Sequence, residues 1–255
     1  MKMSYFYVAL RFFAAGIKFL SILCLPFIFN TSGVAFIAII LGAERFLSFL
    51  TSMENHAYFN RRLILKNHSA ESVNNAHFPI LFYGAFFALI ACYVINYFFQ
   101  ISQDVIPSFF FNLYIISVFS AFHNEIGRRA QSMNDIPSFS IILALKNSTF
   151  GLALLFTAIL ESSDPSVFLN LFALVSVLSF LLCAFAFKKI SIFSIKKVYF
   201  KSLNRKYILA SFKITRKFFL QGVCIFAIPL IERIIIGLNY ETIILAHHFM
   251  LQSLA

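Results

Sequence analysis

The sequence has no tryptophan, only four cysteines and only ten acidic residues among 255. The cysteines at 24, 92, 183 and 224 are far apart, and their spacing fits neither a disulfide framework nor a zinc site. The six histidines show no ligand spacing either, so we expect no metal and no other cofactor. In the absence of tryptophan, tyrosines near the ends of apolar segments would supply the aromatic belt at a membrane interface.

Charged residues are also scarce, at 12% of the chain against 60% for hydrophobic residues. A soluble domain of this size would carry about twice that charged fraction. The net charge is +11, but no soluble domain collects the basic residues, which argues against a nucleic-acid partner. This composition predicts a protein embedded among membrane lipids.

Long apolar runs are what the sequence has in abundance, and each approaches the roughly 20 residues that a membrane-spanning helix needs. We therefore predict an all-α polytopic bundle of about eight spans. The expected spans are 8–29, 33–52, 78–99, 108–126, 138–160, 167–187, 217–237 and 242 onward. The first is too long for a signal peptide and no small-residue cleavage site follows it.

Lys and Arg alternate among the segments that connect these spans. The basic segments are the N-terminal one, 53–77, 127–137 and 188–216, and those without Lys or Arg are 30–32, 100–107, 161–166 and 238–241. Basic connections are typically cytoplasmic. We therefore expect a multi-pass protein of the plasma membrane with a cytoplasmic N-terminus, and we interpret the net charge mainly as a topology signal.

A short pattern occurs twice, at 11–19 and 217–225: a basic residue, Phe-Phe, two variable residues, Gly and a β-branched residue. Two copies in the same orientation, six spans apart, are typical of parallel repeats in transporters. Chance is the alternative, because the chain has 36 phenylalanines. A true repeat would make 1–208 a first transmembrane lobe and 209–255 the start of a second, truncated lobe. We would then expect the chain to be a fragment of a longer transporter.

Three cations lie deep within predicted spans, where a charge costs roughly 2.5–3.5 kcal/mol at the helix centre. At about 1.5 Å per residue, Lys18, Arg45 and Lys146 lie roughly 15, 10 and 12 Å from the cytoplasmic ends of their spans. Their similar depth on three helices predicts a shared cavity for an anionic headgroup, such as a phosphate or diphosphate. For Arg45, snorkelling to the inner interface is the alternative.

Four more residues complete the predicted substrate site: Arg11, Glu44, Asn147 and Arg233. Arg11 precedes Lys18 by seven residues and so shares its helix face, with snorkelling as the alternative. Asn147 belongs to a polar stretch, 146–149, near the centre of its span. Neighbours on a helix do not face each other, so the acid–base pairs 44–45 and 232–233 should meet partners on other helices. Structural ion pairs are the alternative for both.

Three motifs carry a resemblance to a known family. They are Gly16-Ile17-Lys18-Phe19 with Pro26, Asn124-Glu125-Ile126-Gly127-Arg128-Arg129 followed by Lys146-Asn147-Ser148, and Ile228-Pro229-Leu230-Ile231-Glu232-Arg233 followed by Gly237. With them the chain resembles the N-terminal part of polysaccharide (O-antigen repeat-unit) flippases of the multidrug/oligosaccharidyl-lipid/polysaccharide exporter superfamily. The family more often has Asp where Glu232 stands, and residues 246–249 match no family pattern.

The resemblance implies a lipid-linked oligosaccharide substrate on a polyprenyl diphosphate carrier. Such a transporter moves the substrate across the bacterial inner membrane for O-antigen, lipopolysaccharide or capsule biosynthesis, beside polysaccharide-assembly proteins.

Three other readings stay open at this stage. A multidrug exporter of the same superfamily would be expected to have an acidic cavity for its cationic substrates. A membrane enzyme is disfavoured because the outer connections are short and no nucleophile–base spacing stands out, so we expect no catalytic residues. The remaining alternative is a non-functional remnant of a longer protein.

Overall fold

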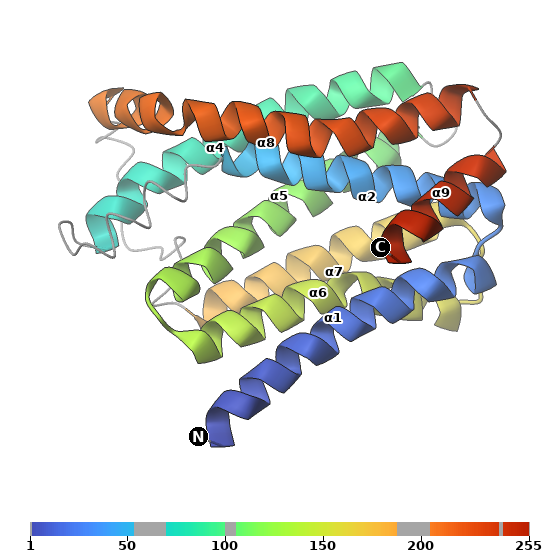
Figure 1. Ribbon diagram of the computed structural model, residues 1–255, viewed down its shortest axis with the longest axis horizontal. Coiled ribbons are helices and arrows are strands. Elements are labelled where there is room, and N and C mark those ends of the chain that lie inside the picture. The colour runs from blue at the N-terminus through green and yellow to red at the C-terminus, as the bar shows by residue number, and fades with distance from the viewer. Residues whose placement is uncertain (1, 54–69, 100–105, 188–204, 240–241, 255) are drawn as a thin grey trace.

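The computed structural model describes residues 2–53, 70–99, 106–187, 205–239 and 242–254. These residues form α-helices without any strand, and short turns join α1 to α2, α5 to α6 and α6 to α7 (Figure 1). The helices are α1 (Lys2–Ile28), α2 (Thr31–Ser52), α4 (Ala70–Phe99), α5 (Ile106–Ser132), α6 (Ile136–Ile159), α7 (Pro165–Ala186), α8 (Arg205–Asn239) and α9 (Thr242–Leu254). Their order confirms the predicted all-α polytopic bundle.

Within the described ranges, five helices contain a segment long and apolar enough to cross a membrane. These segments are Tyr5–Ile28, Thr31–Ser52, Ile136–Ile159, Pro165–Ala186 and Lys213–Ile236. In α4 the apolar stretch found among the described residues runs from Pro79 to Ile95. Large apolar side chains also cover the outside of the bundle, with Phe27 89% and Phe12 75% exposed. An apolar exterior of this extent is characteristic of a membrane protein.

Several helices extend beyond their predicted spans, because backbone hydrogen bonding continues where the apolar run ends. Helix α5 continues through Arg128 and Arg129 to Ser132, so most of the connection predicted at 127–137 is helical. Helix α8 begins at Arg205, twelve residues before its predicted span, and the lobe boundary predicted at 208/209 falls within it. Half of the basic residues that predicted the topology, those at 61–66 and 188–201, lie outside the described residues.

Side chains cap the helices that begin at the short turns. The backbone N–H of Gly33 donates to Asn30 Oδ1 at 2.8 Å, which begins α2. Asp135 and Asp164 accept equivalent bonds at the starts of α6 and α7. A proline stands in the first turn of both α6 and α7, where its missing N–H has no cost. These caps fix the turns that reverse the chain between consecutive helices.

The helices form two layers joined by α5. In one layer α1 packs on α6 and α6 on α7, and in the other α2 packs on α4, α8 and α9. Helix α5 contacts both layers, through α2 and α4 on one side and α6 and α7 on the other. Although they are consecutive, α1 and α2 diverge from their shared turn (Figure 1). The space between the layers is where polar side chains collect.

Candidate functional site

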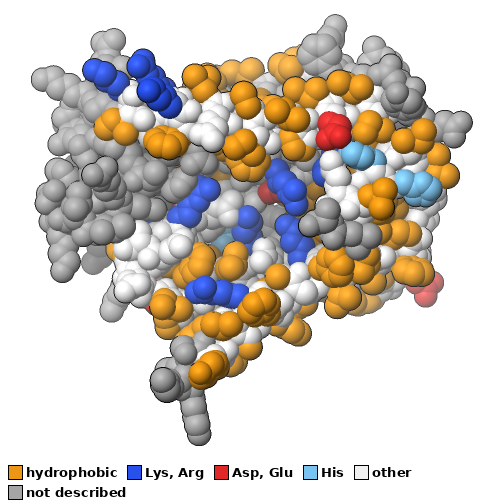
Figure 2. All heavy atoms as spheres, in the orientation of Figure 1, with side chains coloured by type: hydrophobic (Ala, Val, Ile, Leu, Met, Phe, Trp, Pro, Cys, Tyr) orange, Lys and Arg blue, Asp and Glu red, His pale blue; other side chains and the backbone are white. Residues whose placement is uncertain are grey.

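A cavity of about 320 Å³ lies between the two layers. It is bounded by α1, α2, α5, α6, α7 and α8. Figure 2 shows this face of the molecule, where Lys and Arg side chains gather in a hollow between α8 and α1. The polar residues that line the cavity are Lys18, Glu44, Arg45, Ser48, Ser52, Ser120, His123, Asn124, Arg128, Lys146, Asn147, Thr149 and Ser176.

Five of the seven predicted site residues line this cavity. Lys18 comes from α1, Glu44 and Arg45 from α2, and Lys146 and Asn147 from α6. Three helices that are separate in the sequence thus bring their cations to one place, as their similar depth predicted. Their role in binding a substrate stays a prediction.

A close approach of α1 and α6 brings Lys18 towards Lys146. A Cβ atom at Gly151 would lie 2.7 Å from Ser21 Oγ and 2.9 Å from Ile17 Cγ2, so only glycine fits there without a shift. Ile17 precedes Lys18 on α1, and Gly151 follows Lys146 by little more than one turn of α6. Because Gly151 has no side chain, α1 and α6, which carry the two lysines, can approach each other closely.

Positive charge predominates in the cavity. Among the described residues, four Lys and Arg side chains line it, from Lys18, Arg45, Arg128 and Lys146, against the single carboxylate of Glu44. Glu44 interacts electrostatically with Lys18 and with Lys146, so it offsets only part of their charge. Like charges held together away from water repel strongly, and an anion between them would relieve that repulsion.

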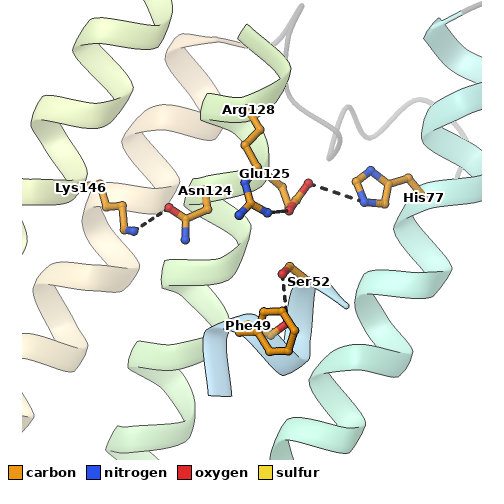
Figure 3. Close-up of polar contacts among 7 residues, drawn as sticks. All are labelled: Phe49, Ser52, His77, Asn124, Glu125, Arg128 and Lys146. Atoms are coloured by element: carbon orange, nitrogen blue, oxygen red, sulfur yellow. Dashed lines mark hydrogen bonds and ion pairs between the residues drawn. The ribbon is translucent and has the colours of Figure 1, made fainter. Parts of the chain in front are cut away.

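The cations differ in how they are held. Lys146 Nζ donates a hydrogen bond of 2.6 Å to Asn124 Oδ1 on α5 (Figure 3). Within the part of the chain that the structure describes, no hydrogen-bond partner is found for Lys18 or Arg45. An asparagine oxygen is neutral and leaves the charge of Lys146 intact. Lys18, Arg45 and Lys146 therefore present cations whose hydrogen-bonding capacity is not consumed by carboxylates.

Arg128 is a cavity residue that the sequence analysis placed in a connection. Helix α5 runs past the predicted end of its span, and Ser120, Asn124 and Arg128 follow one another at intervals of four on it. Residues at this spacing share one helix face, and all three line the cavity. The spacing was available in the sequence, and extending it by one turn would have found Arg128.

Arg11 and Arg233 are not among the residues that line this cavity, and their predicted role in binding a substrate stays a prediction. Arg11 Nε donates to Ser140 Oγ at 2.9 Å, and its guanidinium lies 4.7 Å from the centre of the Phe139 ring. These contacts attach α1 to α6. A long side chain can satisfy its charge against a hydroxyl and an aromatic face without reaching the cavity.

Arg233 is buried at the junction of three helices. Its Nη1 donates to the carbonyl oxygen of Ala38 on α2 at 2.6 Å, and its Nη2 donates to Gln252 Oε1 on α9 at 3.2 Å. Its neighbour Glu232 lies 3.2 Å from His248 Nε2 on α9. The prediction that this acid–base pair meets partners on other helices is confirmed, and its contacts are those of a structural junction.

Metal binding finds no support among the described residues, where no group of three or more His, Cys, Asp or Glu side chains could hold an ion. All four cysteines are free. Comparison of the chain with protein-family models, with curated proteins and with solved structures finds no match. The chemistry of the cavity therefore carries the functional argument.

Proposed function

We propose that this chain binds a polyprenyl-diphosphate-linked oligosaccharide and takes part in moving it from the inner to the outer leaflet of the bacterial inner membrane. The observation that carries the proposal is the cluster of four Lys and Arg residues around a cavity within apolar helices. Buried cations are costly in a membrane and usually mark the path of a substrate. The N-terminus and the connection after α5 face the cytoplasm in this proposal.

The diphosphate would occupy the cavity between Lys18, Arg45 and Lys146. Charge-assisted hydrogen bonds from ammonium and guanidinium groups to phosphate oxygens are about twice as strong as neutral ones. The volume of about 320 Å³ suits a headgroup and lies at the small end of the range for small-molecule sites. Transport would follow from exposing the site alternately to the two sides of the membrane.

The excess of basic residues favours this function over export of cationic drugs. Of the side chains that the structure describes in the cavity, a cationic substrate would meet four Lys and Arg residues and only Glu44 as a carboxylate. The charge balance of the cavity therefore favours an anionic substrate, because the carboxylate of Glu44 offsets only part of the positive charge.

The binding step can be tested with the purified chain in lipid nanodiscs. Undecaprenyl diphosphate should bind more tightly than undecaprenyl monophosphate, and neutral undecaprenol should bind weakest. Lys18→Ala and Lys146→Ala should each lower the affinity for the diphosphate about tenfold or more, the value of one charge-assisted contact. Lys217→Ala, which removes an exposed lysine of α8 outside the cavity, is the matched control.

Arg should restore part of the binding at positions 18 and 146, whereas Gln should not, because the requirement is for charge. Equal binding of the diphosphate and of undecaprenol would overturn the proposal, as would unchanged binding by a variant with alanine at 18, 45 and 146. In a strain that lacks its own flippase, the same substitutions in a transport-competent protein should lower surface polysaccharide at unchanged protein level.

A further inference from the structure

A charged cluster lies beside the cavity, where α4 meets α5. Glu125 is 1% exposed, and its Oε1 lies 2.9 Å from Arg128 Nη1. Its Oε2 lies 3.6 Å from His77 Nε2 on α4. Figure 3 shows the Glu125 carboxylate between these two side chains. The proposed function assigns no role to Glu125.

Arg128 belongs to this cluster and to the cavity at once. Its side chain is 32% exposed, it lines the cavity, and it interacts electrostatically with Lys146. An anion in the cavity would therefore compete with the carboxylate of Glu125 for the guanidinium of Arg128. Moving Arg128 to the anion would remove one cation from a carboxylate buried at 1% exposure, which is unfavourable unless another cation takes its place.

Arg129 can take that place. It lies four residues after Glu125, one helical turn away, and the two interact electrostatically. Its side chain is 3% exposed, and neither Nη1 nor Nη2 has a hydrogen-bond partner within the described part of the chain. Two buried guanidinium nitrogens without hydrogen-bond partners are a costly arrangement, which hydrogen bonds to a nearby carboxylate would relieve.

We propose that Arg128 is a further anion-binding residue and that it reaches its ligand by an exchange of cations on Glu125. When the anionic headgroup enters the cavity, Arg128 turns from Glu125 to the headgroup, and Arg129 replaces it on the carboxylate. Glu125 then acts as a positioning residue that sets how readily Arg128 is released. This inference rests on the proposed function, whose diphosphate site it extends by one residue.

The test measures binding of inorganic diphosphate to the purified full chain by calorimetry. Glu125→Gln removes the rival anion and should tighten binding about fivefold, because Arg128 no longer has to leave a carboxylate. Arg128→Gln should weaken binding about tenfold. It should also abolish the gain of Glu125→Gln when the two are combined. Glu232→Gln removes a carboxylate outside the cavity and is the matched control.

Arg129→Gln separates exchange from a structural role. It should weaken binding in the wild-type background, where the departure of Arg128 would leave Glu125 poorly compensated. It should have little effect in the Glu125→Gln background, where no carboxylate remains. A purely structural role of this cluster would instead lower affinity in every variant together with its melting temperature. Arg129→Gln keeps the bond between Glu125 and Arg128, so it serves as the decisive variant if Glu125→Gln does not fold.

Failure of the proposed function and failure of the cation exchange give different results. Absence of diphosphate binding by the wild-type chain would overturn both the proposed function and the exchange. Binding that is lost in Lys146→Ala but unchanged in Glu125→Gln and Arg129→Gln would leave the site standing and overturn the exchange alone. Weaker binding by a folded Glu125→Gln variant would also overturn it.

Discussion

At the scale of single residues, two arginines on facing helices are expected to differ in how much they contribute to stability. Arg233 is buried and donates to the Ala38 carbonyl and to Gln252, so Arg233→Ala should destabilise the purified protein by about 2–3 kcal/mol. Arg45 is exposed to the cavity among other cations, so Arg45→Ala should change stability by no more than about 0.5 kcal/mol. Thermal or denaturant unfolding in detergent measures both, and an equal loss in the two variants would contradict the assignment.

The sequence predicted the lysines of the cavity better than its arginines. Lys18 and Lys146 lie deep in apolar runs, where a charge has to face a polar space. Their depth was therefore enough to predict that they line a cavity. Arginine has longer reach and more donors, and it can be satisfied by carbonyls, hydroxyls and rings that no sequence pattern reveals. Arg11 and Arg233 lie outside the cavity for this reason. Which partner each arginine selects depends on packing between helices far apart in the chain.

At the scale of helices, the two glycines of the repeated pattern provide a matched pair. A Cβ atom at Gly222 of α8 would overlap the Phe49 ring, whereas nothing lies within 4 Å of one at Gly16 of α1. Phe49 cannot move freely, because it stacks between Phe219 and Phe226. Gly16→Ala should therefore be neutral or stabilising by up to about 1 kcal/mol, the usual gain within a helix. Gly222→Ala should be destabilising by a comparable amount or more.

The free energies of unfolding of the two alanine variants, measured under identical conditions, test this prediction. A neutral Gly222→Ala would show that α8 is not held against α2 through Phe49, and destabilisation by Gly16→Ala would show that α1 is closely packed at Gly16. The different surroundings of Gly16 and Gly222 also show that a shared pattern need not mean shared packing. Whether the pattern is a true repeat stays a prediction.

Helix positions were predictable where an apolar run ends at a capping residue. Asn30 and Asp164 stand at such ends, and the helices there begin within two residues of the prediction. The prediction failed where a helix runs on into polar sequence, as α5 does through Arg128 and Arg129. Hydropathy reports where the chain meets lipid, whereas a helix ends where its last backbone groups find other partners. That difference hid Arg128 from the sequence analysis.

At the scale of the whole molecule, the predicted orientation in the membrane can be tested at two exposed positions. Gln131 lies near the end of α5 in a basic segment, and Ser163 precedes α7 in a segment without Lys or Arg. Because basic segments stay in the cytoplasm, Ser163→Cys should react with a membrane-impermeant thiol reagent in intact cells, whereas Gln131→Cys should not. The four native cysteines are first replaced, and Gln131→Cys should react once the cells are permeabilised, which shows that the position is accessible.

The opposite labelling pattern would show that the protein has the inverse orientation in the membrane. It would also remove a premise of the proposed function. Arg128 lies one turn from Gln131 on α5, so the orientation determines which side of the membrane the Glu125–Arg128 cluster faces. An anionic headgroup that starts in the inner leaflet meets this cluster first only if Gln131 is cytoplasmic. The labelling experiment therefore tests the topology and, with it, a premise of the proposed direction of transport.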